Sequence, residues 1–247
     1  TRDGVMRFLE ERGAGYPVGA AGVVPIVTGA IIFDLGLNPD GPRPGADCGY
    51  AAAEAAGVGP VEEGSVGAGA GATVGKLRGG TRSVKGGVGA ATIRLESNGL
   101  IVSALMVVNA VGDVVDPRTG AVVAGVRDDN GGFMDARRLL REEPAPDAGG
   151  ANTTIGVVLT NARLTKAEAN KVAQMAHDGL ARAIVPSHTP ADGDTMFSMA
   201  TGHLVEGYSV SQVGALAAEA VADAILSAVR SATGAGGVPA IGELPGR

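Results

Sequence analysis

The middle of the chain alternates apolar and polar residues, and this alternation predicts antiparallel strands. Residues 88–95 and 100–108 flank Ser97-Asn98-Gly99, and an Asn-Gly step between two such runs is typical of a tight hairpin. The second run is nearly all apolar, which indicates a strand covered on both faces. Residues 112–115 and 121–126 flank another turn. The pattern therefore predicts a meander of antiparallel strands.

A period of three to four residues replaces the period of two elsewhere and predicts helices. One is expected over residues 3–12 and a short Ala-rich one over residues 50–56. Thr165-Lys166-Ala167-Glu168 is a capping box that opens a third helix with an apolar face. From Ser211 to about Ser231 an Ala-rich stripe predicts a helix suited to close packing on a sheet.

Extended segments and loops account for the remaining chain. Extended segments are expected at residues 16–18, 23–35, 155–160 and 195–201. Loops rich in Gly or Pro are expected at residues 38–49, 57–75 and 128–150. The last loop carries Arg, Glu, Pro and Gly and little that could enter a core, so it is predicted to be a mobile tether.

Composition restricts the class of protein. Hydrophobic residues make up 45% of the 247 positions but aromatics only 3%, so the core must consist of closely packed small aliphatic side chains. The net charge of -6 argues against a nucleic-acid partner. The single cysteine, Cys48, fits a reducing compartment. Without a signal peptide or an apolar run of about 18 residues, the chain is expected to be soluble and cytoplasmic, with no membrane partner.

Three familiar kinds of site fit the sequence poorly. The Gly-rich run before Lys76 lacks the spacing of a phosphate-binding loop, because Ala70 and Leu77 replace the required Gly and Ser or Thr. The histidines are few and far apart, which argues against a metal site; they are His177, His188 and His203. Asp192 and Asp194 lack the other oxygen ligands of a calcium loop. No metal or organic cofactor is therefore predicted.

The junction between Asn152 and Thr153 offers a specific chemistry. If the Thr153 hydroxyl attacks the preceding carbonyl, the peptide bond becomes an ester that water opens, and Thr153 becomes an N-terminus. The new amine, with an ordinary pKa of about 7.7 to 8.0, can then act as the base for its own hydroxyl. An Asn-Thr-Thr segment before a strand is also an ordinary turn exit, so the spacing alone leaves both interpretations open.

Six separated stretches, in order, support the first interpretation. They are residues 3–13, 31–35, 71–76, 107–112, 152–155 and 192–197. On these stretches the chain resembles the self-processing aminopeptidases of the L-aminopeptidase/D-amidase/D-esterase type, peptidase family S58, which include nylon-oligomer hydrolases. The resemblance implies an α/β fold, the four-layer αββα sandwich of N-terminal-nucleophile hydrolases. It also implies one hydrolase domain over residues 1–247, cut into an α chain (1–152) and a β chain (153–247).

The resemblance assigns roles to individual residues. Thr153 matches the nucleophile after cleavage between Asn152 and Thr153. Lys76 matches an active-site lysine whose charge would keep the new amine neutral, and Asn109 matches an amide that holds the nucleophile or the oxyanion. Asp192 and Asp194 match the acidic pair that positions the new amine and hydroxyl.

The chain departs from its relatives at two places. Phe33 occupies a possible oxyanion-side position where many relatives carry a Tyr, and Phe has no hydroxyl to assist the oxyanion. Relatives also have a substantial portion before the helix at residues 3–12, which this sequence is expected to lack.

The predicted function is that of an autoprocessed aminopeptidase acting on small peptides or peptide-like amides through an acyl-enzyme on Thr153. Three alternatives remain open: an endo-hydrolase of 6-aminohexanoate (nylon) oligomers, a self-cleaving acyltransferase of the ornithine acetyltransferase type, and a non-catalytic remnant. A homo-oligomer of α/β heterodimers, tetramer-like, is expected because relatives assemble.

Overall fold

The computed structural model describes residues 1–37, 39–142 and 152–245. It divides into two compact units, one made of residues 1–31 and 40–61, the other of residues 32–39 and 62–247. The candidate site residues all lie in the second unit, so the site is described within that unit. The prediction of a single domain stays a prediction.

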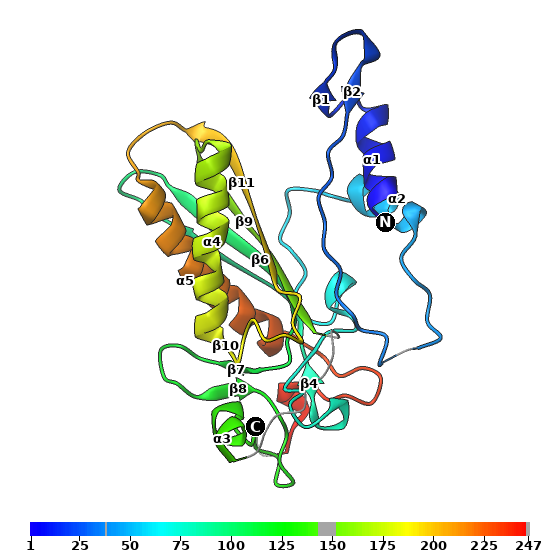
Figure 1. Ribbon diagram of the computed structural model, residues 1–247, viewed down its shortest axis with the longest axis vertical. Helices are drawn as coiled ribbons and strands as arrows, with labels where there is room; N and C mark the ends of the chain where they lie inside the picture. Colours follow the sequence, from blue (N-terminus) through cyan, green and yellow to red (C-terminus); the bar gives the residue numbers. More distant parts are fainter. Residues whose placement is uncertain (38, 143–151, 246–247) are drawn as a thin grey trace. The chain divides into compact units, whose positions relative to one another are not determined.

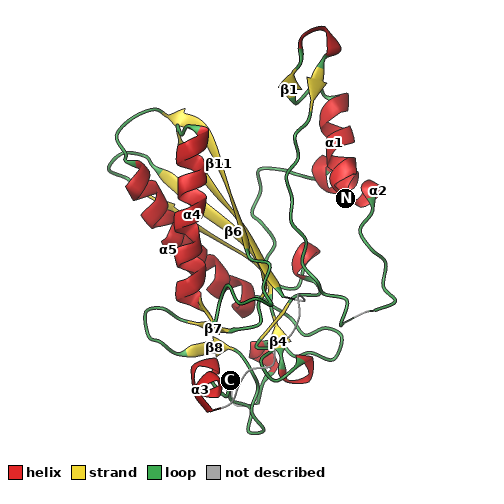
Figure 2. Cartoon of the chain, viewed as in Figure 1, coloured by secondary structure: helices red, strands yellow, loops and turns green. Residues whose placement is uncertain are grey.

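The first unit contains two α-helices, a single 3-10 turn at Gly19–Ala21 and a short hairpin (Figure 2). Helix α1 (Arg2–Glu11) is the helix predicted at residues 3–12, and α2 (Ala46–Glu54) begins four residues before the helix predicted at residues 50–56. Part of the loop expected at residues 38–49 is therefore helical. In the extended segment predicted at residues 23–35, only β2 (Val23–Val24) is a strand, and it pairs with β1 (Tyr16–Pro17).

The second unit is organised around a four-stranded sheet with the order β11-β9-β6-β5. Its strands are β5 (Gly87–Arg94), β6 (Ile101–Asn109), β9 (Thr153–Ala162) and β11 (Thr195–Leu204). Strands β5, β6 and β9 are antiparallel neighbours, and β11 runs parallel to β9. The predicted hairpin is confirmed, and the strands expected at residues 155–160 and 195–201 are both longer than expected.

Helices α4 (Lys166–Ala183) and α5 (Val210–Arg230) lie side by side on one face of this sheet (Figure 1). The predicted capping box is present, because Thr165 and Glu168 exchange hydrogen bonds between side chain and backbone. A Cβ on Gly179 would collide with the carbonyl oxygen of Ala218, so small residues let the two helices approach closely. Among the described helices, α5 alone has the length and apolarity of a membrane span, and most of it is buried inside the unit.

Strand β6 corrects one prediction. Its alternate residues Val102, Ala104, Met106 and Val108 are buried in the core with α5, whereas the residues between them are only partly buried. The strand is thus fully covered on the helix side alone. The nearly continuous apolar run did not distinguish the two faces, because Ile, Leu and Val tolerate partial exposure.

Shorter elements surround one end of the sheet. A three-stranded sheet has the order β10-β7-β8, from β7 (Asp113–Val115), β8 (Val122–Ala124) and β10 (Ile184–Val185), and a two-stranded sheet joins β3 (Thr73–Val74) to β4 (Val84–Lys85). Single 3-10 turns of this unit occur at Gly67–Gly69, Gly80–Arg82 and Ile241–Glu243. The predicted meander therefore splits between two sheets.

The tether predicted at residues 128–150 is partly wrong. Its described portion contains α3 (Ala136–Glu142), in which Ala136 and Leu139 are buried. The buried carboxylate of Asp113 accepts hydrogen bonds from the backbone N–H groups of Ala136, at 2.7 Å, and Val126, at 3.0 Å. This contact anchors the start of α3. Residues 143–150 of the predicted tether lie outside the described residues.

Candidate active site

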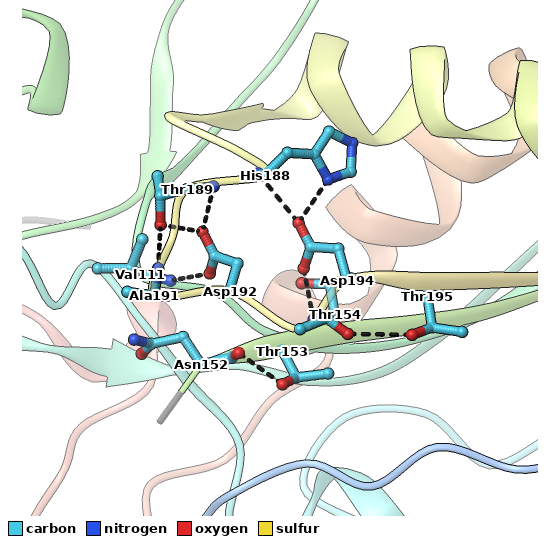
Figure 3. Close-up of polar contacts among 11 residues, drawn as sticks. Val111, Asn152, Thr153, Thr154, His188, Thr189, Ala191, Asp192, Asp194 and Thr195 are labelled. Atoms are coloured by element: carbon cyan, nitrogen blue, oxygen red, sulfur yellow. Dashed lines mark hydrogen bonds and ion pairs between the residues drawn. The ribbon is translucent and has the colours of Figure 1, made fainter. Parts of the chain in front are cut away.

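Thr153 begins strand β9, and its hydroxyl lies against the preceding peptide bond. Oγ1 of Thr153 donates a hydrogen bond of 2.5 Å to the carbonyl oxygen of Asn152 (Figure 3). The backbone N–H of Gly193 donates to the same oxygen at 2.8 Å. Thr153 is only 7% exposed and Asn152 is buried too. The hydroxyl is thus held beside the carbonyl group that the predicted self-attack would use.

The strand register distinguishes Thr153 from its neighbour Thr154. Thr153 is the direct cross-strand partner of Asn109, whereas Thr154 is the partner of Val108. Directly opposed residues carry their side chains on the same face, with Cβ atoms roughly 4.5–5.5 Å apart. Thr154 therefore faces the core with Val108, and its buried hydroxyl has no hydrogen-bond partner among the residues that the structure describes. Only Thr153 shares the face of Asn109.

Asn109 is held by hydrogen bonds on both sides of its amide. Its Oδ1 accepts from Nζ of Lys76, at 2.9 Å, and from the backbone N–H of Thr73, at 3.0 Å. Its Nδ2 donates to the carbonyl oxygen of Phe33, at 3.0 Å. The amide orientation is fixed by these partners, so Asn109 connects Lys76 to the strand that faces Thr153.

Lys76 is largely removed from solvent, and this changes its acidity. Burial lowers the pKa of Lys76 to about 7, and the nearby charge of Asp192 opposes that shift. Nζ also donates to the backbone carbonyl of Asn109, at 3.2 Å. The side chain can therefore change charge near neutral pH without leaving its partners.

Asp192 and Asp194 lie on the loop that leads into β11 and runs beside the start of β9 (Figure 3). Oδ2 of Asp192 accepts from the backbone N–H of Thr189, at 3.1 Å, and from its hydroxyl, at 2.6 Å; Oδ1 accepts from the N–H of Val111, at 3.4 Å. In this uncut chain Asp192 therefore holds the loop together and to the segment after β6.

Asp194 joins the same loop to β9. Its Oδ1 accepts from the backbone N–H of Thr154, at 2.8 Å. Its Oδ2 accepts from the N–H of His188, at 3.1 Å, and lies 3.0 Å from Nδ1 of the His188 ring. Burial raises the pKa of Asp194, against the opposing effect of the hydrogen bond from Thr154. That Asp192 and Asp194 position a new amine stays a prediction, because neither carboxylate bonds to Thr153 here.

Phe33 takes part through its backbone. Its ring is 50% exposed, and its carbonyl is the acceptor for Asn109. Phe33, Lys76 and Asn152 line a cavity of about 660 Å³, together with Asp34 and Thr73. The cavity thus extends from the aromatic ring to the predicted cleavage site.

Two features of the site were not assigned by the sequence. The N–H of Gly193 donates to the Asn152 carbonyl oxygen. His188, for which the sequence argued only against a metal site, contacts Asp194 with both its backbone and its ring. The available sequence signal for the Gly193 donor was a glycine between two carboxylates. A backbone donor carries no side-chain signature, so the motif alone could not reveal it.

The second unit has an Ntn-hydrolase-like α/β fold, in which two helices cover one face of the sheet. A hydroxyl, an amide, a lysine and two carboxylates lie close to the start of one of its strands. The structure resembles the L-aminopeptidase D-Ala-esterase/amidase of Ochrobactrum anthropi, a variant of the Ntn hydrolase fold, with a TM-score of 0.51, 20% identity, and coverage of 76% of this chain and 49% of that chain. It resembles a Burkholderia sp. beta-aminopeptidase with a TM-score of 0.65, 26% identity, and coverage of 97% and 67%.

The chain belongs to peptidase family S58, whose family model matches residues 1–240. It is 44% identical to an uncharacterized aminopeptidase of Mycobacterium tuberculosis, over 96% of this chain and 72% of the relative. It is 33% identical to a 6-aminohexanoate-oligomer endohydrolase of Paenarthrobacter ureafaciens, over 82% of this chain and 61% of the relative. The protein is therefore a hydrolase of peptide or amide bonds, of the aminopeptidase or nylon-oligomer hydrolase type. The predicted family and fold class are confirmed.

Proposed function

We propose that the protein is an autoprocessed N-terminal-nucleophile amide hydrolase with Thr153 as its nucleophile. The observation that carries the proposal is the 2.5 Å contact between Oγ1 of Thr153 and the carbonyl oxygen of Asn152. Cleavage there yields an α chain of residues 1–152 and a β chain of residues 153–247. The two chains stay together because β9 pairs with β6 over the whole length of the sheet.

The freed amine of Thr153 then serves as the base for its own hydroxyl. It accepts the hydroxyl proton as the oxygen attacks the substrate carbonyl, and it returns that proton to the leaving amine. Lys76 in its charged form favours the neutral amine and supports developing negative charge. Asn109, which faces Thr153 and is held by Lys76, orients the nucleophile or donates to the oxyanion. Water finally releases the acyl group from Thr153.

The substrates we propose are small peptides or peptide-like amides with a free amino end. The aminopeptidases among the relatives support this class, and the cavity of about 660 Å³ beside Asn152 has the size of a small-molecule site. The 33% identity to a 6-aminohexanoate-oligomer endohydrolase supports a second candidate, the cleavage of linear amide oligomers. The cytoplasmic location and the homo-oligomer stay predictions.

A comparison of two substrates tests the proposal. The purified protein should release p-nitroaniline from an aminoacyl p-nitroanilide faster than it cleaves a 6-aminohexanoate oligomer, and Thr153→Ala should do neither. Faster cleavage of the oligomer would favour the second candidate. Full activity in Thr153→Ala would exclude Thr153 as the nucleophile under either candidate.

A further inference from the structure

The carbonyl oxygen of Asn152 has two hydrogen-bond donors, and one of them is a backbone group. Asn152 forms a parallel bridge with Asp192, and this bridge directs the N–H of Gly193 at the Asn152 oxygen, 2.8 Å away. Two residues later β11 begins, parallel to β9, so the donor belongs to the ordered edge of the sheet. The N–H is therefore fixed before any reaction begins.

Gly193 also leaves space for the hydroxyl. A Cβ built on Gly193 would lie 2.9 Å from Oγ1 of Thr153. The loop cannot easily move away, because Asp192 is bonded to Thr189 and Val111 on one side of Gly193. On the other side Asp194 is bonded to β9. A side chain here would therefore displace the Thr153 hydroxyl from its place beside the carbonyl group.

We propose that the backbone N–H of Gly193 stabilises the oxyanion of self-cleavage, and that the missing side chain of Gly193 keeps the Thr153 hydroxyl in its attacking position. This inference rests on the proposed autoprocessing. It assigns self-cleavage a donor distinct from Asn109, the amide predicted to serve the nucleophile or the oxyanion. A donor 2.7–3.1 Å from the future oxyanion has the geometry that such stabilisation requires.

Self-cleavage proceeds through a tetrahedral oxyanion and then an ester. Oγ1 of Thr153 bonds to the carbonyl carbon of Asn152, the carbonyl oxygen becomes the oxyanion that Gly193 holds, and the hydroxyl proton is transferred to the nitrogen of Thr153. The carbon–nitrogen bond then breaks with its electron pair on that nitrogen, and the carbonyl re-forms as an ester. Water adds to the ester and the carbon–oxygen bond breaks. One water proton goes to Oγ1 of Thr153, which regains its hydroxyl, and the other goes to the freed amine of Thr153, so that Asn152 ends as a carboxylate.

The test is the rate of self-cleavage, followed by intact mass in freshly prepared protein. Gly193→Ala keeps the backbone N–H but displaces the Thr153 hydroxyl, so it should slow self-cleavage at least about 100-fold, as the loss of attack geometry commonly does. Gly242→Ala is the matched control, because a Cβ on Gly242 meets nothing within 4 Å, and it should cleave like the wild type. Adding Thr153→Ser to Gly193→Ala should restore at least part of the lost rate, because Ser lacks the β-branch and can place its hydroxyl differently.

Three outcomes would overturn the inference: self-cleavage of Gly193→Ala at the wild-type rate, no rescue by Thr153→Ser, or a melting temperature of uncut Gly193→Ala well below that of uncut Thr153→Ala. The last two would indicate a merely structural defect. A wild-type protein that is never cut before Thr153 would instead contradict the proposed function itself, whatever Gly193→Ala does.

Discussion

Asn109 and Thr153 are direct partners in the antiparallel ladder between β6 and β9. Because side chains alternate along a strand, this register places both side chains on the face away from α5, and a slip of one residue would turn Thr153 into the core. Lys76 is bonded to the same amide. The hydroxyl and the amide are therefore positioned by one pair of strands, and the amide in turn holds the Lys76 side chain.

The Asn109 amide should be important for stability as well as for the reaction. Asn109→Leu leaves the buried N–H of Thr73 without its acceptor, so we expect the free energy of unfolding to fall by about 1–3 kcal/mol and self-cleavage to stop. Urea denaturation measures the first effect. Asn109→Asp keeps the acceptor and is the matched control, which should lose less stability. Equal stability of Asn109→Leu and the wild type would contradict the role of the amide.

Lys76 should give the protein a distinct dependence of stability on pH. Burial lowers its pKa from 10.5 to about 7, so between these values the unfolded chain binds this proton more tightly than the folded one. The free energy of unfolding therefore increases as pH rises from about 7 to 10.5, because in that window the unfolded chain still holds this proton and the folded chain has lost it. The same gain is lost as pH falls from 10.5 to about 7. The free energy of unfolding of the wild type, minus that of Lys76→Met, should increase from pH 7 to pH 10 in urea titrations. A difference that does not change with pH would show that Lys76 is not buried in this way.

His188 should set the acid limit of activity through Asp194. The His188 ring lowers the pKa of this buried carboxyl, whereas the charge of Asp192 raises it. His177 packs against the other side chain of this pair, the His188 ring. Removing the ring should therefore raise the pKa of Asp194 further. Because His188 has a positive φ of 54°, the suitable variant is His188→Asn, since Asn tolerates that backbone region.

The expected result is a shift of the acid limb of kcat/KM to higher pH in His188→Asn, with a several-fold loss of activity at pH 5. His203→Ala, at an exposed histidine of β11, is the control and should leave the pH profile unchanged. An unchanged pH profile in His188→Asn would show that His188 does not set the acid limit of activity.

Two glycines between α4 and α5 should respond differently to the same change. A Cβ on Gly179 would have the backbone of Ala218 as its nearest neighbour, whereas the three atoms nearest to one on Gly214 belong to the flexible side chain of Met175. Gly179→Ala should therefore lower the free energy of unfolding by about 1–3 kcal/mol. Gly214→Ala should be close to neutral, because Met175 can move and Ala favours the helix by about 1 kcal/mol. Thermal unfolding of both variants measures this, and the opposite order of stability would contradict the close packing of the helices.

Local signals predicted much of the fold. The Asn-Gly hairpin and the Thr165 capping box were read correctly because each depends on residues a few positions apart. Helix α3 was missed, since its start is anchored by Asp113, which lies 23 residues earlier. Strand β6 is fully covered on one face only, and the predicted meander is split between two sheets. Both features depend on which elements pack together, and a single apolar run does not encode that packing.

Some residues of the candidate site were likewise predictable from the sequence, and others were not. Asn152 and Thr153 were found from their own chemistry, and the resemblance supplied Lys76 and Asn109, which the structure brings together. Gly193 acts through its backbone, so only the pairing of two distant segments could reveal it. The choice of Thr153 over Thr154 also required the register of β9 against β6.

Intact mass and N-terminal sequencing of the purified protein under denaturing conditions test the central claim most directly. We expect two fragments from the wild type, one of them beginning Thr153-Thr154-Ile155, and a single uncut chain from Thr153→Ala. A wild-type chain that stays whole, or a Thr153→Ala chain cut at the same bond, would contradict it.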